Sequence, residues 1–258
     1  MTARESKGPR LFVSTVRFSF AQHLGETLSL SPTDSHYIRD VLRLRTGECL
    51  ELGDSESGVV AITTITETEP SVSVTLRSIL EASDTGIRGP TLFCALLKGQ
   101  KNDLICDWAT ELGCSQIIFW QSARSIVRLD SEKDRLHKET RLSKIAHAAA
   151  QQSRQVKPPD VRVTHSLAEA LKLISSDDSS EDFRLICSLR SEARPIREII
   201  EEHRGVAHYV IAIGPEGDFA PEEETTLHEL GFHAASLGRR TLRSELAVVT
   251  ALSSCYRA

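Results

Sequence analysis

The chain has 258 residues, of which 40% are hydrophobic and 26% charged, and its formal net charge is −5. This length and composition allow a normal buried core, favour two unequal domains, and exclude wholesale disorder. No apolar run approaches the roughly 18–20 residues that cross a bilayer, and the polar first ten residues lack the apolar core of a secretory signal. We therefore expect a soluble cytoplasmic protein with no membrane partner.

The cysteines and histidines follow no metal-binding or disulfide pattern. No two of the six cysteines have Cys-x-x-Cys spacing, most of them lie inside apolar runs, and the nine histidines form no His-Glu-x-x-His motif. We therefore expect buried, reduced thiols and no metal.

Charge is distributed unevenly along the chain. Residues 46–84 contain eight acidic residues and one basic residue, whereas residues 124–162 contain ten basic and five acidic residues. Residues 236–258 contain four basic residues and one acidic residue. Because phosphate binding depends on the local potential, a basic stretch on an acidic protein can still bind nucleic acid. A solvated helix surface explains the 124–162 stretch equally well.

The chain up to about residue 85 has the pattern of a small β-barrel. Alternating or β-branched residues predict strands at 10–16, 48–52, 58–66 and 71–76. One helix is expected at 35–41, with Thr33 or Asp34 as its N-cap. The segment 81–90, which contains two glycines and a proline, is the candidate linker.

Short apolar strands alternate with helices after the linker. Strands are expected at 91–97, 116–120, 184–189, 206–213 and 234–237, and helices at 101–112, 134–153, 167–174, 196–203, 221–230 and 244–256. This alternation predicts an α/β fold with a mostly parallel sheet covered by helices on both faces.

Two of these strands end in segments typical of a ligand site, which in open α/β sheets lies beyond the carboxyl ends of the strands. The strand ending at Ile213 continues into Gly214-Pro215-Glu216-Gly217, whose glycines allow backbone to approach a ligand closely. The strand ending at Leu237 continues into the charged segment 238–245. An ordinary strand-to-helix turn and a solvated loop remain alternatives for the two segments. The strand end at Leu189 is a weaker third signal.

Several common enzyme motifs are missing from the sequence. No Gly-x-Gly-x-x-Gly follows a strand, and neither Gly-x4-Gly-Lys-Ser/Thr nor Gly-x-Ser-x-Gly occurs. Dinucleotide-binding, P-loop and α/β-hydrolase interpretations therefore lack their defining elements.

An ordered set of motifs resembles the RsmE group of knotted (SPOUT) RNA methyltransferases. Ile213–Gly217, followed by Leu237-Gly238-x-Arg240-x-Leu242-Arg243-x-Glu245-x-Ala247, is similar to the paired C-terminal signature of that group. Shorter matches occur in order at Arg10–Val13, His36–Gly47, Lys98-Gly99, Ala109–Gly113 and Gln152–Arg154. Each motif is common, but the ordered set covers nearly the whole chain and is specific.

The chain departs from the pattern of this group at three places. Asp218 stands where the group usually has a second glycine, and Leu246 where it usually has threonine. Residues 156–158 are less basic than is usual in the group. The first two departures bear on cofactor affinity and loop shape, and the third bears on RNA contacts around Arg154.

The resemblance implies a fold, an activity and a set of partners. It implies an RNA-binding, PUA-like β-barrel over residues 1–82 and a methyltransferase domain with a deep trefoil knot over residues 83–258. The implied reaction is methylation of a 16S ribosomal RNA uridine at N3 with S-adenosylmethionine. The implied partners are ribosomal RNA or the small ribosomal subunit and a second copy of the chain in a homodimer.

The resemblance and the residue chemistry together give candidate site residues. The candidate cofactor-binding residues are Leu189, Ile213, Gly214, Pro215, Glu216, Gly217, Leu237, Gly238, Thr241, Leu242, Arg243 and Ala247. The candidate catalytic residues, which would stabilise the developing uridine anion or position a phosphate, are Arg154, Arg243 and Arg10. The candidate RNA-binding residues are Arg39, Arg43, Lys98, Lys101, Arg124, Arg128 and Arg154. Arg39 and Arg43 are expected to share one face of the first helix. Glu245 is a candidate base, although a carboxylate there also suits a helix N-terminus.

Three other functions remain open. The chain is alternatively another SPOUT methyltransferase that acts on tRNA or on a ribose 2′-hydroxyl, or a non-catalytic RNA-binding or ribosome-assembly factor. A Rossmann-type enzyme for a small molecule is the third alternative, which the separate β-rich first domain disfavours.

Overall fold

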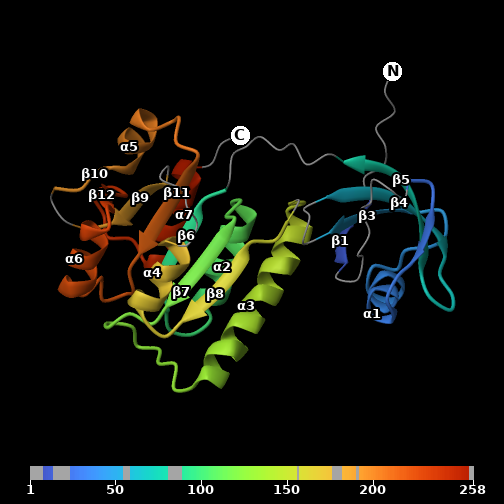
Figure 1. Ribbon diagram of the computed structural model, residues 1–258, viewed down its shortest axis with the longest axis horizontal. Helices are drawn as coiled ribbons and strands as arrows, with labels where there is room; N and C mark the ends of the chain where they lie inside the picture. The colour runs from blue at the N-terminus through green and yellow to red at the C-terminus, as the bar shows by residue number, and fades with distance from the viewer. Residues whose placement is uncertain are drawn as a thin grey trace. The chain divides into compact units, whose positions relative to one another are not determined.

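The chain divides into two structural units in the computed structural model (Figure 1). The first unit consists of Met1–Thr85 and Ala150–Pro158, and the second of Gly86–Ala149 and Pro159–Ala258. The structure describes residues 8–13, 24–54, 59–80, 89–155, 157–175, 182–189 and 192–255. The domain boundary expected between residues 82 and 83 lies outside these described residues.

A five-stranded sheet forms the centre of the first unit. Its strands lie in the order β1-β3-β4-β5-β2, with β1 parallel to β3 and the other neighbours antiparallel. Alternate apolar side chains of the strands pack against Ile38 in a single core. The bounds are Arg10–Val13 (β1), Thr27–Ser29 (β2), Cys49–Asp54 (β3), Val60–Glu67 (β4) and Ser73–Leu80 (β5).

The helix expected at residues 35–41 begins earlier, because Ser31 is its N-cap rather than Thr33 or Asp34. The Oγ atom of Ser31 accepts a hydrogen bond from the backbone N–H of Asp34 at 3.1 Å, and a proline occupies the first helical turn. The bounds are Pro32–His36 for α1 and Tyr37–Val41 for η2, the π-helical turn that continues it.

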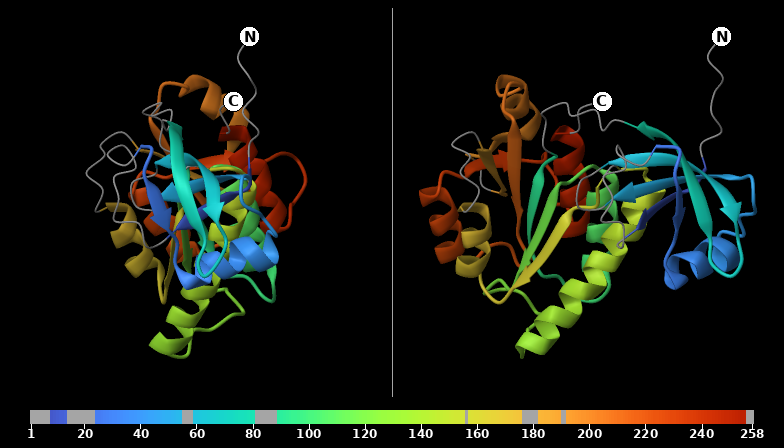
Figure 2. Two further views of the ribbon diagram at one scale, coloured as in Figure 1. Left: turned by 90° about the vertical axis from the view of Figure 1, so that its right-hand side faces the viewer. Right: turned by 45° about the vertical axis from the view of Figure 1, so that its right-hand side comes forward.

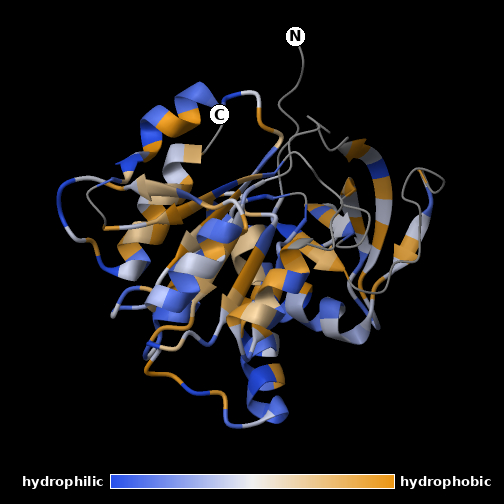
Figure 3. Ribbon diagram, turned by 60° about the vertical axis from the view of Figure 1, so that its left-hand side comes forward, coloured by the Kyte–Doolittle hydropathy of each residue, from blue (hydrophilic) through white to orange (hydrophobic). Residues whose placement is uncertain are grey.

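A seven-stranded sheet forms the centre of the second unit. Its strands lie in the order β10-β12-β9-β11-β6-β7-β8, and every pair of neighbours is parallel over the described residues. β11 is buried along its whole length, and Figure 3 shows the central strands of this sheet largely in hydrophobic colours. The bounds are Thr91–Ala95 (β6), Gln116–Trp120 (β7), Asp160–Thr164 (β8), Asp182–Cys187 (β9), Arg194–Pro195 (β10), His208–Ile213 (β11) and His233–Ser236 (β12).

Helices cover both faces of this sheet, as the sequence pattern predicts (Figure 2). One apolar cluster joins one face of the sheet to α2, α3, α5 and α7, and a second cluster joins the other face to α4 and α6. The bounds are Lys101–Glu111 (α2), Glu132–Gln152 (α3), Leu167–Ser175 (α4), Ile196–Glu202 (α5), Pro221–Glu229 (α6) and Ser244–Cys255 (α7). The chain is therefore an α/β protein with a parallel sheet in its second unit.

The cysteines are free thiols, and burial raises the pKa of Cys106 to about 12. Over the described ranges, no cluster of three or more His, Cys, Asp or Glu side chains is placed to hold a metal ion. In the part of the chain that the structure describes, no helix is both long and apolar enough to cross a membrane.

Candidate active site

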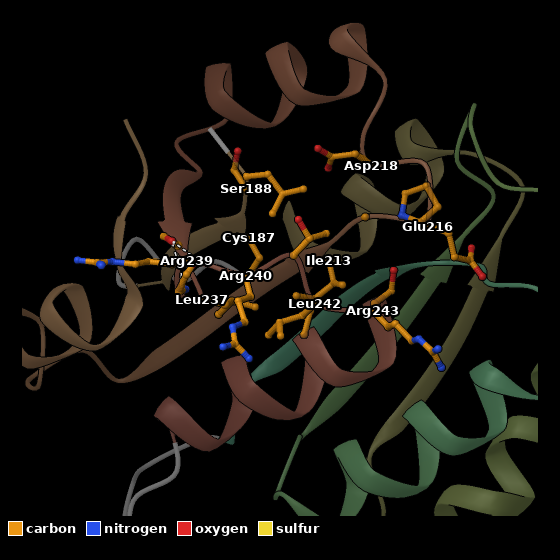
Figure 4. A pocket seen from close by; sticks show the side chains of 18 residues that line it. Cys187, Ser188, Ile213, Glu216, Asp218, Leu237, Arg239, Arg240, Leu242 and Arg243 are labelled. Atoms are coloured by element: carbon orange, nitrogen blue, oxygen red, sulfur yellow. Dashed lines mark hydrogen bonds between the residues drawn. The ribbon is translucent and has the colours of Figure 1, made fainter. Parts of the chain in front are cut away.

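A pocket of about 430 Å³ lies in the second unit, where strands β9, β11 and β12 end (Figure 4). The segments that follow β11 and β12 form most of its lining, so the structure brings together the two loops that the sequence singles out. The lining residues are Cys187, Ser188, Leu189, Ile213, Gly214, Pro215, Glu216, Asp218, Ser236, Leu237, Gly238, Arg239, Arg240, Thr241, Leu242, Arg243, Ser244 and Ala247.

The loop after β11 requires glycine at its first position. A Cβ atom on Gly214 would lie 3.0 Å from the ring of Phe219 and 3.2 Å from its backbone nitrogen. Phe219 cannot easily give way, because it is 4% exposed and its ring centroid lies 6.3 Å from that of the buried Trp120. The backbone of this wall is therefore held against the core while its other side lines the pocket.

Glu223 fastens the same loop to the segment that follows β7. Its buried carboxylate accepts hydrogen bonds from the backbone N–H of Ala220 at 3.0 Å, the hydroxyl of Ser122 at 2.8 Å and the backbone N–H of Ala123 at 2.9 Å. These bonds satisfy a donor at the start of α6 and fix the neighbouring segment.

Arg124 adds a further tie between these two segments. Its guanidinium donates a hydrogen bond at 3.0 Å to the carbonyl oxygen of Gly217. Gly217, expected among the cofactor-binding residues, therefore faces Arg124 and is not part of the pocket lining. All the other expected cofactor-binding residues line the pocket.

The loop after β12 supplies cations to the pocket. The side chains of Arg239, Arg240 and Arg243 are exposed and make no hydrogen bond or ion pair with any residue in the described ranges. Figure 4 shows their guanidinium groups diverging from one another. Gly238, with a φ of 127°, provides the turn that leads into them.

An ion-pair cluster borders the pocket beside Glu216. The Nζ atom of Lys101 lies 3.0 Å from Oε1 of Glu216 and 3.7 Å from Oε2 of Glu245. The hydrogen bond to Glu216 raises the pKa of Lys101. Burial acts to raise the pKa of Glu216, but hydrogen bonds from backbone N–H groups and from Lys101 outweigh it and lower that pKa. Both groups therefore keep their charge around neutral pH, and Lys101, an expected RNA-binding residue, is paired here with acids.

Two of the expected catalytic arginines lie in the first unit and share one buried carboxylate. Nε of Arg10 donates to Oε2 of Glu51 at 2.9 Å, and a terminal nitrogen of Arg154 donates to Oε1 of Glu51 at 3.0 Å. Arg10 also donates to the carbonyl oxygens of Arg154 and Gln155, so each of its guanidinium nitrogens is engaged. The side chain of Arg10 is 7% exposed, whereas that of Arg154 is 40% exposed.

Arg39 and Arg43 do not share a helix face, so this prediction is wrong. Helical structure ends at Val41, and Arg43 follows with a φ of 56°. Arg39 forms an ion pair with Glu69 at 3.1 Å, while the side chain of Arg43 is exposed. Lys98 and Arg128, two expected RNA-binding residues of the second unit, are also exposed.

Sequence reasoning missed a minority of the pocket residues. Ser188 and Cys187 directly precede Leu189, at the strand end that gives the weakest signal. Asp218 departs from the family pattern and is not among the expected cofactor-binding residues. The other pocket residues that were not expected lie in the sequence beside expected residues of the loop after β12, and they are Ser236, Arg239, Arg240 and Ser244.

Comparison with known proteins adds a family and several relatives. The family model described as "RNA methyltransferase domain" matches residues 89–255. The chain is 29% identical to ribosomal RNA small subunit methyltransferase E of Bacillus subtilis (strain 168), over 88% of this chain and 89% of the relative. It is 26% identical to the protein of the same name from Synechocystis sp., over 96% of this chain and 80% of the relative.

Solved structures of similar proteins superpose over nearly the whole chain. Ribosomal RNA small subunit methyltransferase E from Neisseria gonorrhoeae, bound to S-adenosylmethionine, has a TM-score of 0.78 and 26% identity, over 95% of this chain and 96% of that one. A putative methyltransferase from Legionella pneumophila, in complex with the same cofactor, has a TM-score of 0.77 and 25% identity, over 96% of both chains.

Proposed function

The chain belongs to the RNA methyltransferase domain family, and we propose that it methylates N3 of a uridine in 16S ribosomal RNA with S-adenosylmethionine as the methyl donor. The observation that carries this proposal is the pocket in which the loops after β11 and β12 form adjoining walls. The activity agrees with the names of its relatives, which are ribosomal RNA small subunit methyltransferases.

The residues of the pocket fit an adenosyl cofactor. A volume of about 430 Å³ lies within the range of small-molecule sites. Ile213, Leu237, Leu242 and Ala247 offer apolar surface for the adenine base, and the backbone of Gly214, packed against Phe219 on its core side, lines the pocket on the other. When bound, the cofactor supplies an electrophilic methyl group on its sulfonium. The chain's own task is then to hold and align the two reactants.

Arg243 is the best-placed group for the substrate side of the reaction. N3 of uridine carries a proton that must leave, so positive charge near the base stabilises the developing anion. Arg243 lies on the pocket lining with an exposed guanidinium that pairs with no described residue. Arg154 is a second exposed guanidinium, held by Glu51, and we assign it to anion stabilisation or phosphate positioning. Arg10 acts through Glu51 and the carbonyl of Arg154, which makes it a positioning residue.

The first unit is proposed as a PUA-like RNA-binding domain over residues 1–82, and residues 83–258 as a SPOUT domain with a trefoil knot. The exposed side chain of Arg43 supports RNA contact by the first unit. The exposed side chains of Lys98, Arg124 and Arg128 support RNA contact by the second unit. The protein is proposed to act in the cytoplasm as a homodimer during ribosome biogenesis. The similarity to ribosomal RNA small subunit methyltransferases supports the role in ribosome biogenesis.

The test is product analysis. The protein is incubated with S-adenosylmethionine carrying a labelled methyl group and, separately, undermethylated small subunits, free ribosomal RNA and tRNA. Nucleoside mass spectrometry should find label in 3-methyluridine of small-subunit RNA, and a Gly214→Val variant should give none. Label on a ribose 2′-oxygen or in tRNA would assign the chain to another SPOUT activity. Failure to bind the cofactor would favour a non-catalytic RNA-binding factor.

A further inference from the structure

Asp218 is a pocket residue to which the proposed reaction gives no task. It lines the pocket and has a φ of 61°, a left-handed conformation that non-glycine residues seldom adopt. Aspartate is among the few side chains that tolerate this region, because its short polar group can hydrogen-bond locally. A glycine would adopt the same backbone without strain, so the backbone itself does not call for a carboxylate here.

The carboxylate of Asp218 is held at the pocket wall. Its Oδ1 atom accepts a hydrogen bond from the backbone N–H of Phe219 at 2.9 Å, and its own N–H donates to the carbonyl of Pro215 at 3.0 Å. Phe219 is itself fixed in the core. One oxygen is therefore anchored, and the other is left without a hydrogen bond or an ion pair to any residue that the structure describes.

The pocket lining contains two carboxylates, and Asp218 is the one that forms no ion pair with a described residue. Glu216, the other, is paired with Lys101 at 3.0 Å. Figure 4 shows the carboxylate of Asp218 directed toward the side of the pocket where the hydroxyl of Ser188 lies. The carboxylate of Asp218 and the hydroxyl of Ser188 therefore offer hydrogen-bond acceptors at this side of the pocket. The other charged groups of the lining are Glu216, which is paired, and arginines.

We propose that the free carboxylate oxygen of Asp218 accepts hydrogen bonds from the ribose hydroxyls of the bound adenosyl group and so determines affinity for the cofactor. The inference rests on the proposed function. Carboxylates near the carboxyl ends of parallel strands bind ribose hydroxyls in other nucleotide sites.

The cofactor has two other hydrogen-bond donors: the 6-amino group of its adenine, whose ring suits the apolar surface of Leu237, Leu242 and Ala247, and the ammonium of its amino-acid end. That ammonium shares a carbon with a carboxylate, which suits the unpaired guanidiniums of Arg239 and Arg240 on the β12 loop. Figure 4 shows Arg239 on the left of the view and Arg240 below its centre, whereas Asp218 lies at the upper right. The ribose hydroxyls are therefore the hydrogen-bond donors assigned to the free carboxylate oxygen of Asp218.

The test compares ligands that do and do not carry the amino-acid end. Calorimetry measures binding of S-adenosylmethionine, S-adenosylhomocysteine and 5′-methylthioadenosine to the full chain, to Asp218→Asn and to Asp218→Gly. Asparagine keeps the acceptor for Phe219 but turns the free acceptor into a donor. Since a hydrogen bond to a charged group is at stake, we expect roughly tenfold weaker binding of all three ligands to both variants.

Two controls keep the outcomes separate. Glu222→Gln removes one negative charge from an exposed position on α6 outside the lining and should leave affinity unchanged. Thermal unfolding of the ligand-free variants should show that Asp218→Gly folds as stably as the wild type or more so.

Each outcome has a distinct meaning. A loss confined to the two ligands with an amino-acid end would overturn the ribose assignment, as would wild-type affinity in both variants. No binding of S-adenosylmethionine to the wild-type chain would instead overturn the proposed function.

Discussion

The Nζ atom of Lys101 lies 3.0 Å from Oε1 of Glu216, so the first turn of α2 is tied to the loop that follows β11. This loop is one wall of the pocket. Lys101 also lies 3.7 Å from a buried oxygen of Glu245 that has no hydrogen-bond partner within the described residues. One cation therefore lies between two acids at the border of the pocket.

The first prediction is a pH-dependent contribution of this ion pair to stability. The pKa of Glu216 is lowered from 4.5, so its contribution is present above about pH 4.5 and is lost as pH falls through the lowered value. The pKa of Lys101 is raised from 10.5, so its contribution is complete below about pH 10.5 and is lost as pH rises through the raised value. Lys101→Met should cost about 0.5 kcal/mol between these limits, because both groups are partly exposed.

Thermal unfolding across pH measures this difference. The gap in Tm between the wild type and Lys101→Met should be widest near neutral pH and should narrow at both extremes. Lys133→Met is the matched control, because Lys133 is exposed and pairs with no residue in the described ranges. A gap that stays constant from pH 3 to pH 11 would contradict the assignment.

The second prediction concerns the shape of the pocket wall at Gly214. Gly214→Val should abolish measurable binding of S-adenosylmethionine, because the added Cβ alone would lie 3.0 Å from the ring of Phe219 and the wall would have to move. Gly214→Ala should weaken binding less. Gly205→Ala is the control, since a Cβ there meets nothing within 4 Å. Calorimetry would refute the prediction by finding wild-type affinity in Gly214→Val.

The architecture of the second unit was predictable because its local signals agree with one another. The strand expected at 206–213 is the continuously buried β11, and two turn-forming glycines follow it. Parallel strands place their carboxyl ends at one edge of a sheet, so the segments after Ile213 and Leu237 could be expected to meet. The sequence pattern predicts no strand between the helices at 134–153 and 167–174, yet β8 lies there, at Asp160–Thr164.

The remaining details depend on contacts that sequence spacing does not reveal. The sequence shows that Asp218 replaces a glycine, but not that its Oδ1 is fixed by Phe219. It likewise marks Arg10 and Arg154 as candidate catalytic groups, while their common partner, Glu51, is far away in the chain. Long-range ion pairs of this kind are set by tertiary packing and carry no periodic signal.

The third prediction separates chemistry from cofactor binding at Arg154. Arg154→Ala should keep the wild-type affinity for S-adenosylmethionine, because the pocket lining does not include this residue. Methyl transfer should fall by roughly 10²–10³-fold if the guanidinium stabilises the developing anion. Single-turnover methylation of small subunits measures the rate, and Arg204→Ala, at an exposed position in the turn after α5, serves as the control. Wild-type turnover by Arg154→Ala would remove the residue from the mechanism.

The fourth prediction follows from the carboxylate that the two arginines of the first unit share. Glu51 is 1% exposed and receives hydrogen bonds from Arg10 and Arg154. Glu51→Gln keeps the size of the side chain but leaves the nearly buried Arg10 guanidinium without its counter-charge. Breaking a buried ion pair from one side costs roughly 3–5 kcal/mol. We expect a loss near the lower value, because Arg10 keeps its bond to the carbonyl oxygen of Gln155.

Urea denaturation measures this loss, and Glu48→Gln is the matched control because Glu48 is exposed. A second measurement distinguishes a positioning role from a purely structural one. Arg154 remains present in Glu51→Gln but loses its ion pair and keeps only its hydrogen bond to the carbonyl oxygen of Gly8. Methyl transfer should therefore fall below the wild-type rate at temperatures where the variant is fully folded. The affinity of the second-unit pocket for S-adenosylmethionine should stay unchanged. A folded Glu51→Gln with wild-type transfer would show that Arg154 needs no anchor, and unchanged stability would show that the shared carboxylate contributes nothing to the fold.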